Sequence, residues 1–217
     1  AGFAGAGTQS SAKYGVQKNG SDGYLCALFY FHGYPGCNRN WFEKTAYASL
    51  GYAVFAMDFR GQGGKSQDIG GILGTTVAGH IVAGIDDELD NMIYVKNILD
   101  MCLLIRIAKD IEGIDANNIN CAGGSQGGGF ATMCAGLNDI KKCIILYPFL
   151  SDMKKVYDLD LDLVAYESIR YYARWFSSTG ENDEKLFNRL AYIDAKNFAP
   201  RVKSKVLFGA SNIDVIC

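Results

Sequence analysis

The chain has 217 residues, of which 49% are apolar and 20% are charged, and its formal net charge is −2. A chain of this length fits a single domain and can bury about 70% of the surface of its unfolded form. Without a long run of lysine or arginine it is a poor match for nucleic acid. No window approaches about 18 consecutive apolar residues, so we expect no membrane partner either.

The first half of the chain alternates apolar runs with polar or helical segments. Residues 24–31 and 51–59 predict short buried strands, because both are apolar without strict alternation. Residues 60–80 are rich in glycine and too long for a plain strand-to-helix turn, which predicts a functional or oligomer-facing loop. Apolar residues then recur with a helical period over 87–109, and two aspartates at the start of that segment favour the helix dipole.

The second half continues the alternation. Residues 118–123 predict a weaker strand, a helix pattern follows Ser125, and residues 141–149 and 204–211 predict two more strands. Residues 151–190 predict an amphipathic helical insertion, whose aromatic residues (166, 171, 172, 175 and 176) either line a cleft or, as we prefer, belong to the core or an interface. The whole pattern predicts an α/β fold, a mostly parallel doubly wound sheet in one domain spanning residues 1–217.

The cysteine pattern bears on compartment and on metal binding. The chain has seven cysteines, an odd number, and no two are spaced as C-x-x-C. Several lie in apolar runs, which predicts buried reduced thiols rather than a disulfide framework or a zinc site. The first residues also lack the pattern of a secretion signal. We therefore expect a cytoplasmic location and no metal site built on these cysteines.

The most informative stretch is NINCAGGSQGGGFATMC, residues 118–134, in which five glycines surround Ser125. A flexible linker would have polar flanks, whereas a strand pattern and a helix pattern flank this segment. The dinucleotide-binding pattern G-x-G-x-x-G lacks its second glycine in both possible registers. A phosphate-binding P-loop ending in GGKS at 63–66 fails as well, because Phe59 stands where its first glycine is required.

What remains is the pattern G-x-S-x-G, met by Gly123, Ser125 and Gly127. Between a strand and a helix this pattern predicts a sharp turn that exposes a nucleophilic serine above the sheet. The Gln126 amide would then donate to a developing oxyanion, and a second donor would come from a loop after an earlier strand. The FHGY segment at 31–34 is such a loop, which makes the Tyr34 amide our candidate, with an ordinary turn as the alternative.

The serine requires an acid and a base. In this arrangement the chain order is serine, acid, histidine, and Asp214 follows the predicted strand 204–211 as the acid would. Asp58 precedes the serine, so we expect it to brace Arg60 or its turn. No histidine follows Asp214, and we interpret the two that precede the serine, His32 and His80, as structural.

Several motifs together resemble a known family. The segments are FHGY (31–34), GYAVFAMDFRGQGG (51–64), GTTVAGHI (74–81), GGSQGGG (123–129), YPFLSD (147–152) and NIDVIC (212–217). They are similar to the acetyl xylan esterase and cephalosporin-C deacetylase family, carbohydrate esterase family 7, of the α/β-hydrolase superfamily. The pairing of R-G-Q at 60–62 with G-x-S-Q-G at 123–127 is more specific than G-x-S-x-G alone. The similarity covers nearly the whole chain, thinning before residue 24 and within 153–190.

The resemblance implies roles for individual residues. Ser125 would be the nucleophile and Asp214 the triad acid, with the oxyanion-hole amides from Tyr34 and Gln126, and Arg60 and Gln62 would support the site. It also implies a serine carboxylesterase that removes acetyl groups from acetylated xylo-oligosaccharides or small acetyl esters such as cephalosporin C. Members of the family need no cofactor and typically assemble as hexamers.

The resemblance further implies that a last strand, a base-bearing loop and a final helix are missing from this chain. We therefore expect the 217-residue chain to be almost inactive and to expose a sheet edge prone to aggregation. Phe149 and Pro148 are hypothetical walls of a small acyl pocket. Two alternatives stay open: a non-catalytic sugar-binding relative, and another α/β-hydrolase of the dienelactone-hydrolase or peptidase type.

Overall fold

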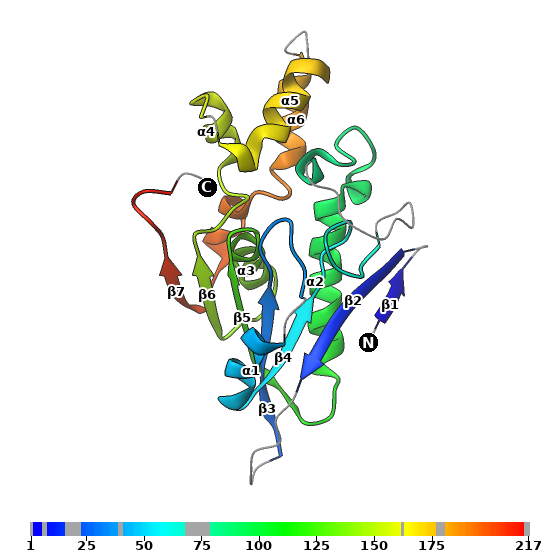
Figure 1. Cartoon of the computed structure of the whole chain (residues 1–217), viewed down its shortest axis with the longest axis vertical. Helices are drawn as coiled ribbons and strands as arrows, with labels where there is room; N and C mark the ends of the chain where they lie inside the picture. The colour runs from blue at the N-terminus through cyan, green and yellow to red at the C-terminus, as the bar shows by residue number, and fades with distance from the viewer. Residues whose placement is uncertain are drawn as a thin grey trace.

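The computed structural model describes residues 2–5, 8–15, 23–38, 41–67, 79–161, 163–176 and 181–214. These residues form one seven-stranded sheet with the strand order β1-β2-β4-β3-β5-β6-β7 (Figure 1). The strands are β1 (Gly2–Gly5), β2 (Thr8–Gly15), β3 (Leu25–Phe31), β4 (Tyr52–Met57), β5 (Ile114–Gly124), β6 (Lys142–Leu146) and β7 (Lys205–Gly209). Strands β3 to β7 are parallel, whereas β1 and β2 pair antiparallel at one edge. The predicted mostly parallel α/β sheet is confirmed.

All five predicted strands are present, and one of them is longer than predicted. The four apolar runs contain β3, β4, β6 and β7. The run taken as the weaker strand belongs to β5, which has 11 residues and pairs with both β3 and β6. Its first half contains the polar residues Asp115, Asn117 and Asn118, so hydrophobicity alone marks only its second half. The antiparallel pair β1 and β2 lies before residue 24, where we had predicted no strand.

Helices cover both faces of the sheet (Figure 1). Helix α1 (Phe42–Ser49) lies on one face, and α2 (Ile93–Lys109) and α3 (Gln126–Leu137) lie on the other. The prediction that a helix starts near residue 87 was wrong, because a separate 3-10 turn, η2 (Leu89–Asn91), precedes α2. The first turn of α2 contains no acidic residue, so the expected dipole interaction does not occur there.

The segment predicted as a helical insertion is helical and lies beyond the carboxyl ends of the strands (Figure 1). It comprises α4 (Met153–Asp158), the 3-10 turn η3 (Val164–Tyr166), α5 (Glu167–Phe176) and α6 (Glu181–Leu190). The buried carboxylate of Asp194 accepts hydrogen bonds from the amides of Asp152 and Met153 at 2.9 and 3.0 Å. This contact fastens the start of α4 to the segment that leads back into β7.

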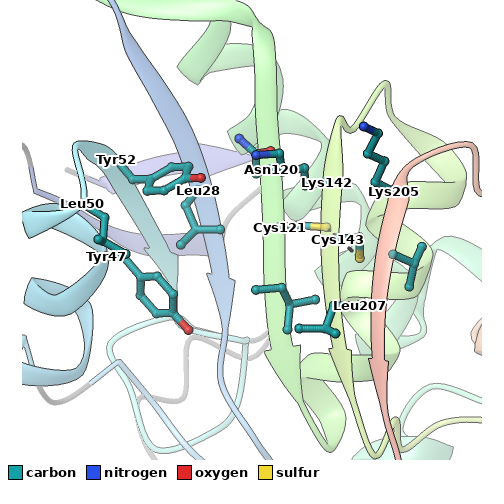
Figure 2. Close-up of a pocket in the computed structure, with 12 residues that line it drawn as sticks. Leu28, Tyr47, Leu50, Tyr52, Asn120, Cys121, Lys142, Cys143, Lys205 and Leu207 are labelled. Carbon is teal, nitrogen blue, oxygen red and sulfur yellow. Dashed lines mark hydrogen bonds between the residues drawn. The ribbon is translucent and has the colours of Figure 1, made fainter.

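A groove of about 400 Å³ lies on the α1 side of the sheet (Figure 2). Tyr47, Leu50 and Tyr52 lie on one side of it, and Leu207 of β7 lies on the other. Beyond β7 no further strand pairs within the described residues. Consecutive side chains on both faces of β7 are exposed: Val206 by 43%, Leu207 by 62% and Phe208 by 59%. Such an apolar strand is typical of a sheet interior, so its exposure at an edge is unusual.

The prediction of buried cysteines is confirmed for three of the six that the structure describes. The six within the described residues (Cys26, Cys37, Cys102, Cys121, Cys134 and Cys143) are free thiols, and the last three are buried. Cys217 lies outside the described residues. In the described part of the chain, no helix has the length and apolar character needed to cross a membrane.

Candidate active site

Ser125 occupies the turn between β5 and α3. Its backbone has φ 53° and ψ −122°, a conformation that residues with a side chain rarely adopt. Its amide donates to the carbonyl of Leu146 at 3.0 Å, and its carbonyl accepts from the amides of Gly129 and Phe149 at 3.1 and 3.0 Å. The neighbouring strand β6 and the residues after it therefore hold the strained turn in place. This is the strand-turn-helix setting that the pattern G-x-S-x-G predicts.

The glycines on either side of the turn are required by close backbone contacts. A Cβ on Gly123 would lie 2.2 Å from the Gly127 carbonyl oxygen. A Cβ on Gly127 would lie 2.0 Å from the carbonyl oxygen of Phe31, at the end of β3. The turn thus brings β5, α3 and the end of β3 into backbone contact, as we expected for these two positions.

The loop after β3 lies beside Ser125. A Cβ built on Gly33 would be 4.0 Å from the Cβ of Ser125, and Tyr34 follows directly. Gln126 is the first residue of α3, and the first amides of a helix have no acceptor within the helix. The structure therefore brings Ser125, Tyr34 and Gln126 together, as an oxyanion hole requires. Their individual catalytic roles stay predictions.

The side chain of Gln126 is fixed by Gln62 of the R-G-Q segment. Each amide donates its Nε2 to the Oε1 of the other, at 2.8 and 3.0 Å, and both side chains are fully buried. The Gln126 Oε1 also accepts from the Tyr94 hydroxyl of α2 at 2.7 Å. Gln62 thereby ties the residue after the nucleophile to the loop that follows β4.

Arg60 connects the R-G-Q segment to helix α2. Its guanidinium forms a two-pronged ion pair with Asp100 of α2, with Nε to Oδ2 at 2.5 Å and Nη2 to Oδ1 at 2.7 Å. Its amide donates to the side chain of Asn97 at 2.8 Å. Of our two expectations for Asp58, only the second is confirmed. Asp58 accepts from the amides of Asn38 and Lys65, which braces the turn, while the carboxylate paired with Arg60 is that of Asp100.

Neither histidine of the chain is available as a base for Ser125, because every ring nitrogen is engaged elsewhere. Nδ1 of His32 bonds the Gly33 carbonyl at 2.9 Å, and its Nε2 accepts from the Phe59 amide at 3.2 Å. Nδ1 of His80 bonds the Tyr34 hydroxyl at 2.8 Å, and its Nε2 bonds the Gly61 carbonyl at 2.9 Å. Both histidines are buried, and the structural interpretation of them is confirmed.

Asp214 lies in the segment after β7 and is partly buried. Because β5, β6 and β7 are parallel, this segment leaves the sheet at the same edge as Ser125. That position is the one expected of a triad acid, and its role stays a prediction.

Ser125 opens into a cavity of about 900 Å³. One part of its wall consists of Tyr34, Pro35, Gly79, Val82 and Phe149, and the other part belongs to the helical insertion. That second part includes Val164, Ala165, Glu167, Ser168, Tyr171, Tyr172 and Phe176. Our preference for core or interface was therefore wrong for Tyr171 and Phe176, which line the cleft, and right for Tyr166, which is buried. Tyr172 lines the cleft and also packs against the core. Phe149 is a wall residue as expected, whereas Pro148 is not among the lining residues.

Sequence reasoning missed two supporting residues, Tyr94 and Asp100. Both lie in α2, 31 and 25 residues before the serine, and nothing in their spacing marks them as partners of Gln126 or Arg60. The sequence marks them only as polar residues among the apolar residues of a predicted helix, which indicates burial but not their partners. Within the described residues, no cluster of histidine, cysteine or carboxylate side chains is suited to hold a metal ion. The groove of Figure 2 shares no residue with the cavity at Ser125.

Comparison with known proteins decides the family. The model of a family described as acetyl xylan esterase (AXE1) matches residues 2–217. The chain belongs to the acetyl xylan esterase family. The resemblance seen in the motifs is thereby confirmed, and so is the α/β-hydrolase fold.

Individual relatives agree with this assignment. The acetyl xylan esterase 1 of Thermoanaerobacterium sp. JW/SL YS485 is 36% identical, with a TM-score of 0.85 over 96% of this chain and 74% of that one. The acetyl xylan esterase of Paenibacillus sp. R4 is 30% identical, with a TM-score of 0.83 over 93% of this chain and 64% of that one. The acetyl esterase Axe7A of Xylanibacter ruminicola is 30% identical over 181 residues, which are 81% of this chain and 39% of that protein. The chain thus spans well under half the length of this last relative.

Proposed function

We propose that the complete protein is a serine carboxylesterase that removes acetyl groups from acetylated xylo-oligosaccharides. The observation that carries this proposal is the strained Ser125 turn, which opens into a cavity beside Tyr34 and Gln126. Membership of the acetyl xylan esterase family supports the acetyl group as the acyl part of the substrate. The size and aromatic lining of the cavity support a large alcohol part, such as a sugar.

The first step is attack by the Ser125 hydroxyl on the acetyl carbonyl carbon. The proton of the hydroxyl passes to a base, and negative charge develops on the carbonyl oxygen. The amides of Tyr34 and Gln126 donate to that oxygen, and one such donor contributes on the order of 100-fold to 1,000-fold in kcat. The bond from carbon to the sugar oxygen then breaks, and the sugar leaves with the proton from the base.

The second step is hydrolysis of the acetyl group on Ser125. Water, activated by the same base, attacks the acetyl carbon and releases acetate, which restores the hydroxyl of Ser125. We propose that the base is a histidine that follows Asp214 in the complete protein, oriented by the carboxylate of Asp214. The engagement of both histidines of this chain with backbone and tyrosine groups supports this proposal. Sequencing the coding DNA beyond Cys217 tests it, and a stop codon there would contradict it.

The acyl group is expected to be small because the aromatic residues Phe149 and Tyr34 line the same cavity as Ser125. Their ring centroids are 6.1 Å apart, and the Phe149 amide bonds the Ser125 carbonyl. Phe149 is therefore fixed relative to the nucleophile through the backbone, so it restricts the length of the acyl chain.

Acetate release tests the function directly. We expect the complete protein to release acetate from acetylated xylo-oligosaccharides and Ser125→Ala to be inactive, with a loss on the order of a millionfold in kcat. Undiminished turnover by Ser125→Ala would overturn the assignment of the nucleophile. Binding of the sugar without acetate release would favour a non-catalytic relative instead.

Three finer points belong to the same proposal. Cephalosporin C is a second substrate, the protein acts in the cytoplasm, and it assembles as a hexamer. Deacetylation of cephalosporin C can be followed in the same acetate assay. Cell fractionation tests the location, and sedimentation of the complete protein tests the assembly, for which a monomer at all concentrations would contradict a hexamer.

A further inference from the structure

His80 connects two loops of the candidate site. It is the first residue of the 3-10 turn η1 (His80–Val82) and is only 3% exposed. One ring nitrogen, Nδ1, lies 2.8 Å from the Tyr34 hydroxyl oxygen, and the other, Nε2, lies 2.9 Å from the Gly61 carbonyl oxygen. His80 therefore bridges the loop after β3 and the R-G-Q turn after β4.

The chemistry of the two contacts fixes the direction of each hydrogen bond. A carbonyl oxygen only accepts, so Nε2 carries the ring proton and donates to Gly61. Nδ1 then has a free electron pair and accepts from the Tyr34 hydroxyl. Burial raises the pKa of Tyr34 above its ordinary value, so the hydroxyl keeps the proton that it donates.

Gly61, which accepts the hydrogen bond from His80, is held in place by its two neighbours. Gly61 has φ +70° and stands between Arg60, paired with Asp100, and Gln62, paired with Gln126. A Cβ at Gly61 would lie 3.4 Å from Nε2 of His80, so the ring is packed closely against this turn. At its other side the ring meets that of Tyr34 edge-on, with centroids 5.3 Å apart.

We propose that His80 is a positioning residue for the oxyanion hole and that it acts through the Tyr34 hydroxyl. By holding the phenol, it fixes the backbone of Tyr34, whose amide faces the developing oxyanion. The inference rests on the proposed function, because it assigns a catalytic purpose to that amide. A displacement of about 1 Å in such a group can cost on the order of 100-fold in rate.

Two substitutions separate the two halves of the bridge. The side-chain oxygen of His80→Asn can occupy the place of Nδ1 and accept from Tyr34. The side-chain nitrogen of His80→Gln can occupy the place of Nε2 and donate to Gly61, which leaves the Tyr34 hydroxyl without its acceptor. In the complete protein we expect His80→Gln to lower kcat at least 10-fold with KM unchanged, and His80→Asn to recover most of that loss.

A double-mutant cycle tests whether the effect passes through the hydroxyl. We expect Tyr34→Phe to lower kcat about as much as His80→Gln, and the double variant to be no worse than either single variant. Losses that multiply in the double variant would overturn the proposal, as would an unchanged kcat in His80→Gln. Tyr34→Phe removes one oxygen atom only, so it provides the test even if His80→Gln fails to fold.

A readout without substrate separates this proposal from the proposed function. Hydrogen exchange of the Tyr34 amide, measured by nuclear magnetic resonance, should quicken at least 10-fold in Tyr34→Phe and in His80→Gln, with amides of α2 as the internal control. If exchange quickens but the unmodified protein releases no acetate, the proposed function fails, and His80 holds the backbone of Tyr34 without a catalytic purpose. If acetate is released and exchange is unchanged, the positioning role fails and the proposed function stands.

Discussion

Gln62 and Gln126 form a reciprocal pair of side-chain hydrogen bonds, with Nε2 to Oε1 distances of 2.8 and 3.0 Å, in a fully buried setting. A buried amide has donor and acceptor groups that must both be satisfied, and each of these two side chains satisfies the other. Since the backbone amide of Gln126 is the candidate oxyanion donor beside Ser125, the pair connects the R-G-Q segment to the candidate oxyanion hole.

The first prediction concerns this pair. Replacing Gln62 by leucine removes one hydrogen-bond donor and one acceptor from the buried Gln126 amide, which should cost about 1–3 kcal/mol in the free energy of unfolding. We also expect kcat of the complete protein to fall at least 10-fold while KM stays nearly constant, because the loss affects a group that acts in the transition state. Urea titration and initial rates measure the two effects.

Tyr94→Phe is the matched control, since it removes only the hydroxyl that donates to the Gln126 Oε1. It should cost less in both stability and kcat than Gln62→Leu, because the reciprocal pair remains. An equal or larger loss of kcat in Tyr94→Phe would show that the reciprocal pair is not what positions Gln126.

The second prediction concerns the buried ion pair of Arg60 and Asp100. Replacing one partner leaves an uncompensated buried charge, so Arg60→Met should lower the free energy of unfolding by about 3–5 kcal/mol. The double variant Arg60→Met with Asp100→Leu should be more stable than Arg60→Met alone, because no charge is left unpaired. Urea unfolding of the three proteins provides the comparison, and a double variant less stable than the single one would contradict it.

The third prediction concerns pH. Burial lowers the pKa of His32, although the neighbouring Gly33 carbonyl and Asp58 oppose this shift. The unfolded chain, with an ordinary histidine pKa of about 6.5, therefore binds a proton more readily than the folded one. The contribution of His32 to stability is then complete above about pH 7.5 and is lost as the pH falls through 6.5 and below.

We expect the free energy of unfolding to decrease between about pH 7 and pH 5, and His32→Gln to flatten that decrease. The side-chain oxygen of glutamine can replace Nε2 as the acceptor of the Phe59 amide, so the variant removes the titration while retaining the contact. Urea unfolding of both proteins between about pH 7 and pH 5 measures this difference in slope. A slope unchanged by His32→Gln would assign the pH dependence to other groups.

The fourth prediction concerns the exposed strand β7. Val206, Leu207 and Phe208 leave apolar surface on both faces of an edge strand, which favours pairing with another copy. We expect the 217-residue chain to self-associate in the micromolar range, and Leu207→Glu to reduce this association. Light scattering over a series of concentrations measures it.

Leu103→Glu in α2 is the control, because Leu103 is also exposed (43%) but belongs to a helix rather than to a sheet edge. The same reduction in Leu103→Glu would mean that net charge, not the edge of β7, governs association. A chain that stays monomeric at all concentrations would contradict the prediction altogether.

The sequence predicted the parts of this fold that have a strong local signal. Apolar runs located β3, β4, β6 and β7, and the glycine spacing around Ser125 located the turn, because backbone contacts at Gly123 and Gly127 exclude any side chain. The start of β5 was missed because the polar residues Asp115, Asn117 and Asn118 interrupt its apolar pattern. The antiparallel pair β1 and β2 depends on pairing with β4, which no local pattern reveals.

The candidate site was predictable only as far as its motifs extend. Gln62 and Arg60 could be named from the R-G-Q segment, but their partners Tyr94 and Asp100 lie on a helix that meets the site only in three dimensions. The cleft lining was misjudged for a similar reason. Tyr171, Tyr172 and Phe176 have the spacing of a buried helix face, and the sequence does not say whether that face meets a core or a cavity.

The most direct test of the central claim is to identify the residue that reacts with an acyl-mimicking phosphonate. The complete protein is treated with an aryl ethylphosphonate, which forms a stable bond with an activated serine, and its peptides are analysed by mass spectrometry. If Ser125 is the nucleophile, one phosphonate is found on the peptide that contains Ser125, acetate release stops, and Ser125→Ala takes up none. A protein that stays active after treatment, or that carries its label on another residue, would contradict Ser125 as the nucleophile.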